Sequence, residues 1–553
     1  MFRFVLLALM FVTNSVIAQI NDSIFAIIDE PPAQEAYTLQ HFAEHYAVVV
    51  DFYASNNYDP IWYRNGELSA PAYELMQLFR DADLQGLRPA DYYANTFDSM
   101  LAKAGNNDIW QARIELLLTL SLLQYTADLK NGRVSPTAHH QGLPVLANPI
   151  DYFALLNTAK SASSMALVVE RYEPTVVLYE DLKQAMLVLR EKHDDPDYEP
   201  LSVGKSIHPN DEMSRSTYTA YANRIRALIS DPADMVFNGI YDDGMASNIA
   251  YIQYRHGLKP DKIIGKRTVA ALNASWHQRR DQTIATMERL RWLPRKVTDQ
   301  RYIIVNVPAF EMYGFEADSA GTQNIAFKSD VIVGKSYRRY RTPLFMADMS
   351  YMVFNPYWNI PRSILRREYL PHITEPGYFD KHSFEMVEFF SANAQIQPVT
   401  DANIQKLREG KLQLRQRKGP ENALGEAKFI FPNVNNVYLH GTPAQQLFAK
   451  ERRDFSHGCI RVEDVPGLAH WILKEQGWNP ETIQAEFDGG QNKIETLDSK
   501  IPVAIIYLTV VVDDRNQIMF HEDIYGHDTV LIKDLGPTAE MVMQSEIEMR
   551  LSE

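Results

Sequence analysis

The chain carries its most informative residues in one stretch, Phe455-Ser456-His457-Gly458-Cys459-Ile460-Arg461-Val462. This stretch contains the only cysteine among the 553 residues, and it follows a second short segment, Tyr438-Leu439-His440-Gly441-Thr442-Pro443. A cysteine nucleophile reacts as its thiolate, and a nearby imidazole can take the thiol proton and later return it to a leaving amine. The two segments therefore predict covalent catalysis by Cys459, with His440 as the general base and acid.

The residues around the two segments predict the local structure of this site. Val437 to His440 is typical of a strand, so His440 would be held at the end of a rigid element. Glu463 to Gln476 is typical of a helix, which would place Cys459 at or just before a helix N-terminus. Such a position would lower the pKa of the thiol and offer backbone N–H groups to an oxyanion. Gly458 would let the backbone approach a substrate closely.

Composition excludes several classes of protein. The formal net charge is −15, whereas nucleic-acid-binding proteins need a positive surface to replace the counterions of phosphates. Hydrophobic residues make up 46% of the chain and charged residues 23%, as in globular proteins. A chain of this length predicts several folded domains.

The N-terminus has the form of a signal peptide, with Arg3 ahead of the apolar run Phe4 to Val12 and the small residue Ala18 before a plausible cleavage point. The apolar run is shorter than the roughly 20 residues that span a bilayer. We therefore expect residues 1–18 to direct export to the periplasm, with no stable membrane span. An exported chain with one cysteine has no internal disulfide, so Cys459 is either a reactive thiol or an inert buried residue.

Periodicity divides the rest of the chain into domains of an α+β protein. Apolar residues at helical spacing predict a helical scaffold domain over residues 19–200. A charged, proline-containing linker follows, and residues 279–299 are expected to form a connecting helix of the scaffold. From residue 300 to 535 the pattern predicts a β-rich domain, with strands rich in β-branched and aromatic residues. An insertion at about 362–412 reads as a helical cap, and residues 536–553 as a C-terminal tail or helix.

Residues 201–278 resemble the small three-helix peptidoglycan-binding module of many cell-wall enzymes. The similarity lies in Gly239 to Gly244, Ile249 to Tyr254, Gly257-Leu258, and Thr268 to Leu272. Apolar helix faces would pack together, with the glycines in tight turns. A plain helical bundle without a ligand remains an alternative.

A different type of site is suggested by His41-Phe42-Ala43-Glu44-His45, which fits the H-x-x-E-H pattern of some zinc peptidases. A five-residue pattern is easily matched by chance, and no third ligand for a zinc ion is identifiable in the sequence. An ordinary amphipathic helix is the preferred interpretation.

The HGTP and SHGCIRV segments together resemble the active-site signature of the YkuD-type L,D-transpeptidases, and the layout resembles the large YcbB-like Gram-negative members. Further similarity lies in Asn355 to Pro361, Asn422 to Gly425 and Phe429 to Pro432. The resemblance implies that Cys459 attacks a peptidoglycan tetrapeptide stem and expels D-alanine. The amine of an acceptor stem would then resolve the acyl-enzyme into a 3→3 cross-link.

The resemblance also implies roles for individual residues. His440, His457, Gly458 and Gly441 would join Cys459 in catalysis, with the second ring nitrogen of His440 held by a carbonyl near Gly441. Substrate-binding residues would be the following: Arg461, Tyr438, Trp358 and Ser456. Read alone, His457 and Trp358 are as consistent with structural roles. Some relatives carry Asp where this chain has Gly441, so a side-chain role at that position is absent.

Three classes of function therefore remain at this point: the transpeptidase, an L,D-carboxypeptidase with the same nucleophile, and a non-catalytic peptidoglycan-binding scaffold. Acyl transfer by a thiolate needs no metal and no organic cofactor, and we expect none. The expected partners are donor and acceptor stem peptides, with unidentified proteins of cell-wall synthesis. The resemblance further implies acylation of the thiol by carbapenems.

Overall fold

The computed structural model describes residues 20–29, 43–139, 149–194, 199–293, 301–319 and 323–536. The expected signal peptide, residues 1–18, lies outside these ranges, as does the expected tail except for residue 536. Within the described ranges, every helix is too short or too polar to cross a bilayer.

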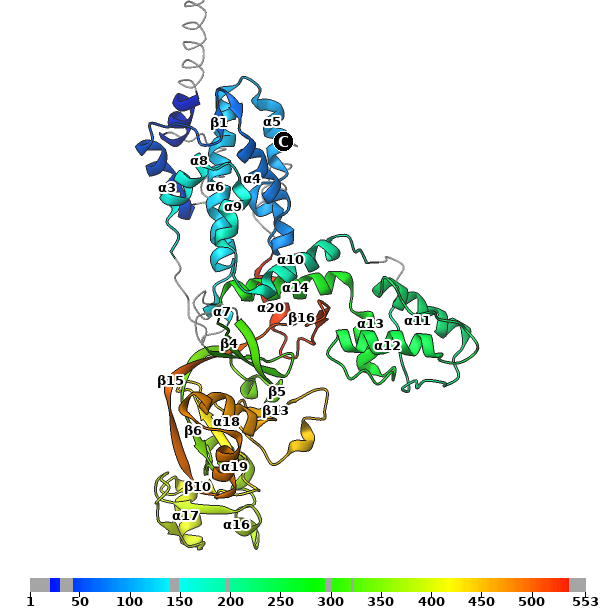
Figure 1. Ribbon diagram of the computed structural model, residues 1–553, viewed down its shortest axis with the longest axis vertical. Coiled ribbons are helices and arrows are strands. Elements are labelled where there is room, and N and C mark those ends of the chain that lie inside the picture. The colour runs from blue at the N-terminus through cyan, green and yellow to red at the C-terminus, as the bar shows by residue number, and fades with distance from the viewer. Residues whose placement is uncertain are drawn as a thin grey trace, which may run out of the picture.

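A helical domain forms the upper part of Figure 1 and is built around α6, Asp108–Asn131. This helix buries side chains on all sides, which makes it the centre of the domain. The Asn107 side chain caps its first turn by accepting from the N–H groups of Ile109 and Trp110. The helices packed around α6 are α3 Ala43–Ser55, α4 Ala70–Arg80, α5 Thr96–Ala104, α8 Tyr152–Ser161 and α9 Met165–Val169.

Two long helices connect this domain to the sheet below it. They are α10, Val177–Arg190, and α14, Trp276–Arg291, which starts with a capping box formed by Ser275 and Gln278. Both pack into one apolar cluster with residues of the C-terminal strands, including Ala504 and Ile506. The expected connecting helix, residues 279–299, overlaps α14, which begins three residues before that boundary, and residues 294–299 lie outside the described ranges.

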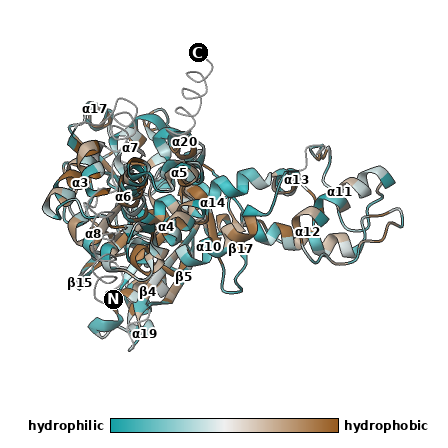
Figure 2. Ribbon diagram, turned by 90° about the horizontal axis from the view of Figure 1, so that it is seen from above, coloured by the Kyte–Doolittle hydropathy of each residue, from teal (hydrophilic) through white to brown (hydrophobic). Residues whose placement is uncertain are grey.

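A three-helix module projects to one side as an arm (Figure 2). It contains α11 Arg215–Leu228, α12 Asp243–Arg255 and α13 Lys266–Asn273. Its own apolar core includes Tyr218, Tyr221, Tyr241 and Ile249, as a separate domain requires.

The β-rich domain is a closed sheet. Its strand order is β13-β5-β14-β12-β11-β6-β15-β3-β4, and β4 also pairs with β5, which closes eight of these strands into a barrel. The strands are β3 Tyr302–Asn306, β4 Glu311–Ala317, β5 Gln323–Gly334, β6 Phe345–Phe354, β11 Ala427–Ile430, β12 Leu439–His440, β13 Asp454–Ser456, β14 Ile460–Val462 and β15 Lys493–Ile506. Three helices accompany them: α18 Val465–Leu473, α19 Pro480–Asp488 and α20 His527–Asp534. The hairpin β16 Val510–Val512 and β17 Ile518–Phe520 forms a separate two-stranded sheet that packs beside the barrel strand β15.

The insertion forms the lower end of the molecule in Figure 1 and differs from the expected helical cap. It contains a four-stranded sheet, β7-β10-β8-β9, as well as short helices. Its elements are β7 Trp358–Asn359, α15 Arg362–Ile364, a π-helical turn Leu365–Tyr369, α16 Tyr378–Lys381, β8 Phe384–Val387, β9 Ile396–Gln397, α17 Asp401–Glu409 and β10 Gln413–Gln416. The sheet extends beyond both predicted limits of the cap, because β7 and β10 pair at its base.

Candidate active site

The site is built where β12 and β14 pair in parallel. His440 is the register partner of Arg461, and Leu439 is the partner of Ile460. Side chains two positions apart on a strand point to the same face, so Tyr438, His440 and Arg461 share one face of the sheet, and Cys459 immediately precedes β14 on that face. The structure thus brings together the residues that the two sequence segments predicted.

Cys459 lies in a tight loop between β13 and β14, and hydrogen bonds within the loop hold it in place. The hydroxyl of Ser456 donates to the carbonyl oxygen of Cys459 at 2.5 Å and accepts from the N–H of Gly458 at 3.0 Å. Gly458 has a φ of +120°, a conformation that other residues avoid. Ser456 is buried, so its hydroxyl is engaged within the loop, whereas the sequence suggested a contact with substrate.

Two residues that sequence reasoning missed stabilise this loop. Thr342 bonds to it directly, and Tyr525 bonds to Thr342. Thr342 donates from its hydroxyl to the carbonyl oxygen of Gly458 at 3.0 Å and accepts from the N–H of Gly334 at 2.9 Å. The hydroxyl of Tyr525 donates to the carbonyl oxygen of Gly334 at 2.6 Å and accepts from the N–H of Thr342 at 3.2 Å. Both residues are far from the loop in sequence, and no local pattern marks them.

The expected helix N-terminus at Cys459 is wrong. Residues 460–462 continue as β14, and α18 begins only at Val465, with Asp464 as its N-cap. Pairing with β12 and β5 imposes extended backbone on residues that the sequence pattern left unassigned. The helix dipole therefore does not act on the thiol, since its effect falls off within the first turn.

The pKa of the Cys459 thiol is raised by burial, which disfavours the thiolate. Three interactions oppose this effect: hydrogen bonds from the backbone and the side chain of Tyr438, and the positive charge of Arg461. The thiol also lies 3.8 Å from the carbonyl oxygen of Asn436. At neutral pH the resting residue is accordingly a thiol.

His440 is buried at the end of β12 and is neutral at physiological pH. Burial, assisted by the charge of Arg461, lowers its pKa to about 3. Its Nδ1 lies 2.6 Å from the carbonyl oxygen of Gly441. A carbonyl only accepts hydrogen bonds, so Nδ1 carries the proton and Nε2 is left with a lone pair. A proton acceptor is therefore present on the same face of the sheet as the thiol.

The backbone at Gly441 is closely packed. A Cβ atom at this position would lie 3.1 Å from Cγ2 of Val465 and 3.3 Å from the Cα of Gly425. The carbonyl of Gly441 holds the ring of His440, so the backbone here orients the imidazole. No space exists for an Asp side chain without a shift of these neighbours.

His457 joins the loop of Cys459 to the cap. Its Nε2 lies 2.7 Å from Oε1 of Glu368, which is part of the π-helical turn Leu365–Tyr369. The ring of Tyr340 packs edge-on against it, with 4.8 Å between the centroids. Sequence reasoning missed both partners, because they come from different parts of the chain.

Trp358 lies at the base of the cap. It is half-buried in β7 and packs edge-on against Tyr369, with 6.1 Å between the ring centroids. Both residues are partly buried and pack against the apolar cluster of the cap. The structure therefore places Trp358 at the edge of the cap core, where its ring packs on Tyr369.

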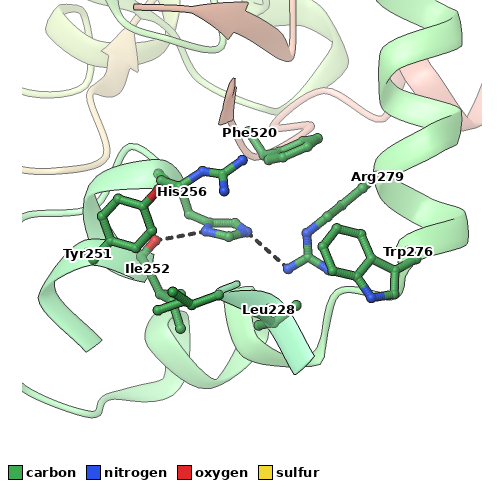
Figure 3. Close-up of a pocket in the computed structure, with 9 residues that line it drawn as sticks. Leu228, Tyr251, Ile252, His256, Trp276, Arg279 and Phe520 are labelled. Carbon is green, nitrogen blue, oxygen red and sulfur yellow. Dashed lines mark hydrogen bonds between the residues drawn. The ribbon is translucent and has the colours of Figure 1, made fainter. Parts of the chain in front are cut away.

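A small pocket lies away from this site, where the module meets α14 and the β16–β17 hairpin (Figure 3). His256 accepts from Arg279 at 3.3 Å, and its Nδ1 lies 2.8 Å from the carbonyl oxygen of Ile252. Trp276 and Phe520 line the other sides. Because its polar groups are satisfied by the protein, the pocket is best described as part of the interface between module and barrel.

The suggested zinc motif is not assembled in the described part of the chain. His41 and the side chain of Glu44 lie outside it, and His45 is buried against Tyr152 with ring centroids 5.1 Å apart. No group of three potential metal-binding side chains occurs among the described residues.

Comparison with known proteins identifies two regions of the chain. Residues 300–503 match the family model of the L,D-transpeptidase catalytic domain, YkuD, and residues 47–186 match that of a scaffold domain. A curated Haemophilus influenzae protein named "Putative L,D-transpeptidase" is 31% identical over 229 residues, which are 41% of this chain and 44% of that protein. The match thus spans less than half of the relative.

Solved structures give weaker similarity. An L,D-transpeptidase of Xylanimonas cellulosilytica is 12% identical and covers 55% of this chain and 100% of its own, with a TM-score of 0.18. One of Stackebrandtia nassauensis is 12% identical and covers 56% of this chain and 95% of its own, with a TM-score of 0.20. Scores this low have no bearing on function.

Proposed function

Because residues 300–503 of this chain are an L,D-transpeptidase catalytic domain of the YkuD family, we propose that the protein forms 3→3 cross-links between peptidoglycan stem peptides through a Cys459 acyl-enzyme, with release of D-alanine. The observation that carries the proposal is the parallel pairing of β12 and β14. This pairing sets a neutral imidazole and a thiol on one face of the barrel, under an inserted cap.

In the acylation step, Sγ of Cys459 attacks the carbonyl carbon of the peptide bond that precedes the terminal D-alanine. The thiol proton passes to Nε2 of His440 as the S–C bond forms, because the raised pKa of the thiol disfavours a preformed thiolate. The imidazolium returns this proton to the nitrogen of the leaving D-alanine as the C–N bond breaks. A thioester and free D-alanine result.

In the second step, the side-chain amine of an acceptor stem attacks the thioester carbonyl. His440 accepts a proton from the amine and delivers it to Sγ, so that the new amide forms and the thiol is regenerated. Gly441 keeps the ring in the required tautomer through its carbonyl. The low pKa of His440 makes the imidazolium short-lived and a strong acid, which favours protonation of a poor leaving group.

Tyr438 and Arg461 are proposed to act on substrate from the same face. Burial and the neighbouring thiol raise the pKa of Tyr438, so its hydroxyl stays protonated and can donate a hydrogen bond. Nε of Arg461 is buried without a hydrogen-bond partner among the described residues. A substrate carboxylate or carbonyl would satisfy it.

The remaining domains fit an exported cell-wall enzyme. We propose that residues 201–278 bind peptidoglycan, that residues 1–18 direct export to the periplasm, and that carbapenems acylate the same thiol. An L,D-carboxypeptidase, in which water replaces the acceptor amine, uses the same residues.

The test is to incubate the purified mature protein with disaccharide-tetrapeptide and to follow products by mass spectrometry. We expect a cross-linked dimer and free D-alanine, and neither with Cys459→Ala or His440→Asn. His277→Asn, at an exposed position on α14, is the matched control and should leave the rate unchanged. Tripeptide alone would instead establish the carboxypeptidase, and unchanged substrate would refute both activities.

A further inference from the structure

A basic loop lies beside the catalytic residues. It comprises residues 335–341, Lys335-Ser336-Tyr337-Arg338-Arg339-Tyr340-Arg341, and joins β5 to β6. The segment holds four cationic side chains and no acidic one, although the chain as a whole has a net charge of −15. Such a local reversal of charge is a typical sign of a site for an anionic ligand.

Three of the four cationic side chains have neither an ion pair nor a hydrogen bond among the described residues. Arg338 and Arg339 are exposed, Lys335 is half-buried, and none of them is within ion-pair distance of a carboxylate among the described residues. Arg341 is different, because its Nε donates to the carbonyl oxygen of Ser336 at 2.9 Å and thereby stabilises the loop itself.

Both ends of the loop are fixed to the catalytic residues. The N–H of Lys335 donates to the carbonyl oxygen of Ser456 at 3.0 Å. At the other end, Thr342 bonds to Gly458, as described above, and the 3₁₀ turn of residues 338–340 is closed by a bond from the N–H of Tyr340 to the carbonyl oxygen of Tyr337. The loop is thus preorganised, which lowers the entropy cost of binding.

Two of the cations lie close to the ring of Tyr340, which contacts the candidate active site. The guanidinium of Arg339 lies 4.7 Å from the centroid of Tyr340, and Nζ of Lys335 lies 5.7 Å from it. Tyr340 in turn packs on His457, two residues before Cys459. The nearby carboxylate of Glu368 is already engaged by His457.

We propose that Lys335, Arg338 and Arg339 bind carboxylates of the stem peptide and so form an anion subsite beside the nucleophile. The inference rests on the proposed function, since it takes a peptidoglycan stem as the ligand. Guanidinium groups match carboxylates in geometry, and two of the three cations are arginines. The subsite orients the stem so that its reacting carbonyl lies at Cys459.

The experiment measures binding separately from turnover. Disaccharide-tetrapeptide is titrated by calorimetry into two proteins. One carries Cys459→Ala alone, and the other carries Cys459→Ala together with Arg338→Gln and Arg339→Gln. Kd should rise about fivefold on loss of the two exposed charges, and the dependence of Kd on salt should become shallower. The matched control removes two exposed charges elsewhere in the same domain, Lys500→Gln and Lys533→Gln, and should leave Kd unchanged.

A second ligand tests whether the loop binds the carboxylates of the stem peptide. A tetrapeptide whose carboxylates are amidated should bind the loop variant and its parent equally. Equal weakening for both ligands, or the same effect in the control variant, would overturn the proposal. If the unmutated enzyme shows no turnover while the charge-dependent binding persists, the proposed catalysis fails and the subsite stands.

Discussion

At the scale of single residues, Arg461 acts on both members of the proposed catalytic pair. Its charge lowers the pKa of Cys459 and also lowers that of His440. The first effect favours the thiolate, and the second disfavours the imidazolium. One side chain therefore makes the thiol easier to deprotonate and the base less inclined to keep the proton.

Arg461→Gln should raise the pKa of Cys459, because burial then acts without an opposing charge. A higher pKa means less thiolate at any pH below it, so alkylation by iodoacetamide at pH 8 should slow by roughly fivefold. The measurement is the rate of alkylation between pH 6 and 10, with the exposed Arg226→Gln as control. A midpoint that stays in place or moves to lower pH would contradict this assignment.

The pairing of His440 with Cys459 could be predicted because the chemistry restricts which residues act together. The protonation states of His440 and Cys459 could not be predicted from the sequence, because they depend on the burial of both side chains in the folded barrel. Thr342 and Tyr525 illustrate the same limit: Thr342 bonds to the loop that holds Cys459, Tyr525 bonds to Thr342, and neither has a local signature.

At the scale of elements, the cap contains strands that the sequence pattern did not predict. Its strands are two to four residues long, which is too short for alternation to be recognised. The three-residue strands β13 and β14 were missed for the same reason. Longer strands such as β3 and β5 are rich in β-branched and aromatic residues, which is the pattern that predicts the β-rich domain.

Glu368→Gln should loosen the cap. The pair with His457 joins the π-helical turn to the catalytic loop, and the amide keeps the shape of the side chain but removes its charge. Both side chains are partly exposed, so we expect a loss of about 1 kcal/mol or less. Hydrogen exchange of the amides in 365–370 should accelerate up to about fivefold.

Glu375→Gln is the control for this experiment, because Glu375 pairs with His372 on the solvent side of the same cap. Unchanged exchange in Glu368→Gln, or equal acceleration in both variants, would show that the contact does not hold the cap.

At the scale of the whole molecule, the module is docked onto the barrel through side chains of opposite charge and through tyrosines. Glu451 accepts from the N–H of Lys259 at 2.9 Å and from Arg267 at 2.7 Å. The hydroxyl of Tyr251 donates to Gln517 at 2.6 Å, and that of Tyr254 donates to Asp513. The arm in Figure 2 therefore has a defined orientation.

The double variant Glu451→Lys and Tyr254→Phe should release the module. Like charges then meet at residue 451, and one hydrogen bond is lost, for a combined cost of about 1–2 kcal/mol. Small-angle scattering should show a larger radius of gyration, with the unfolding temperature of the barrel preserved. Glu388→Lys, on the exposed surface of the cap, is the control. An unchanged radius would mean that other contacts suffice.

Because Cys459 is the only cysteine of the chain, thiol-specific reagents have one site of attachment. A maleimide probe would attach at Cys459 alone, without any engineered replacement of other cysteines. A spin label on Cys459, paired with one introduced on the arm, would report the distance between the barrel and the module.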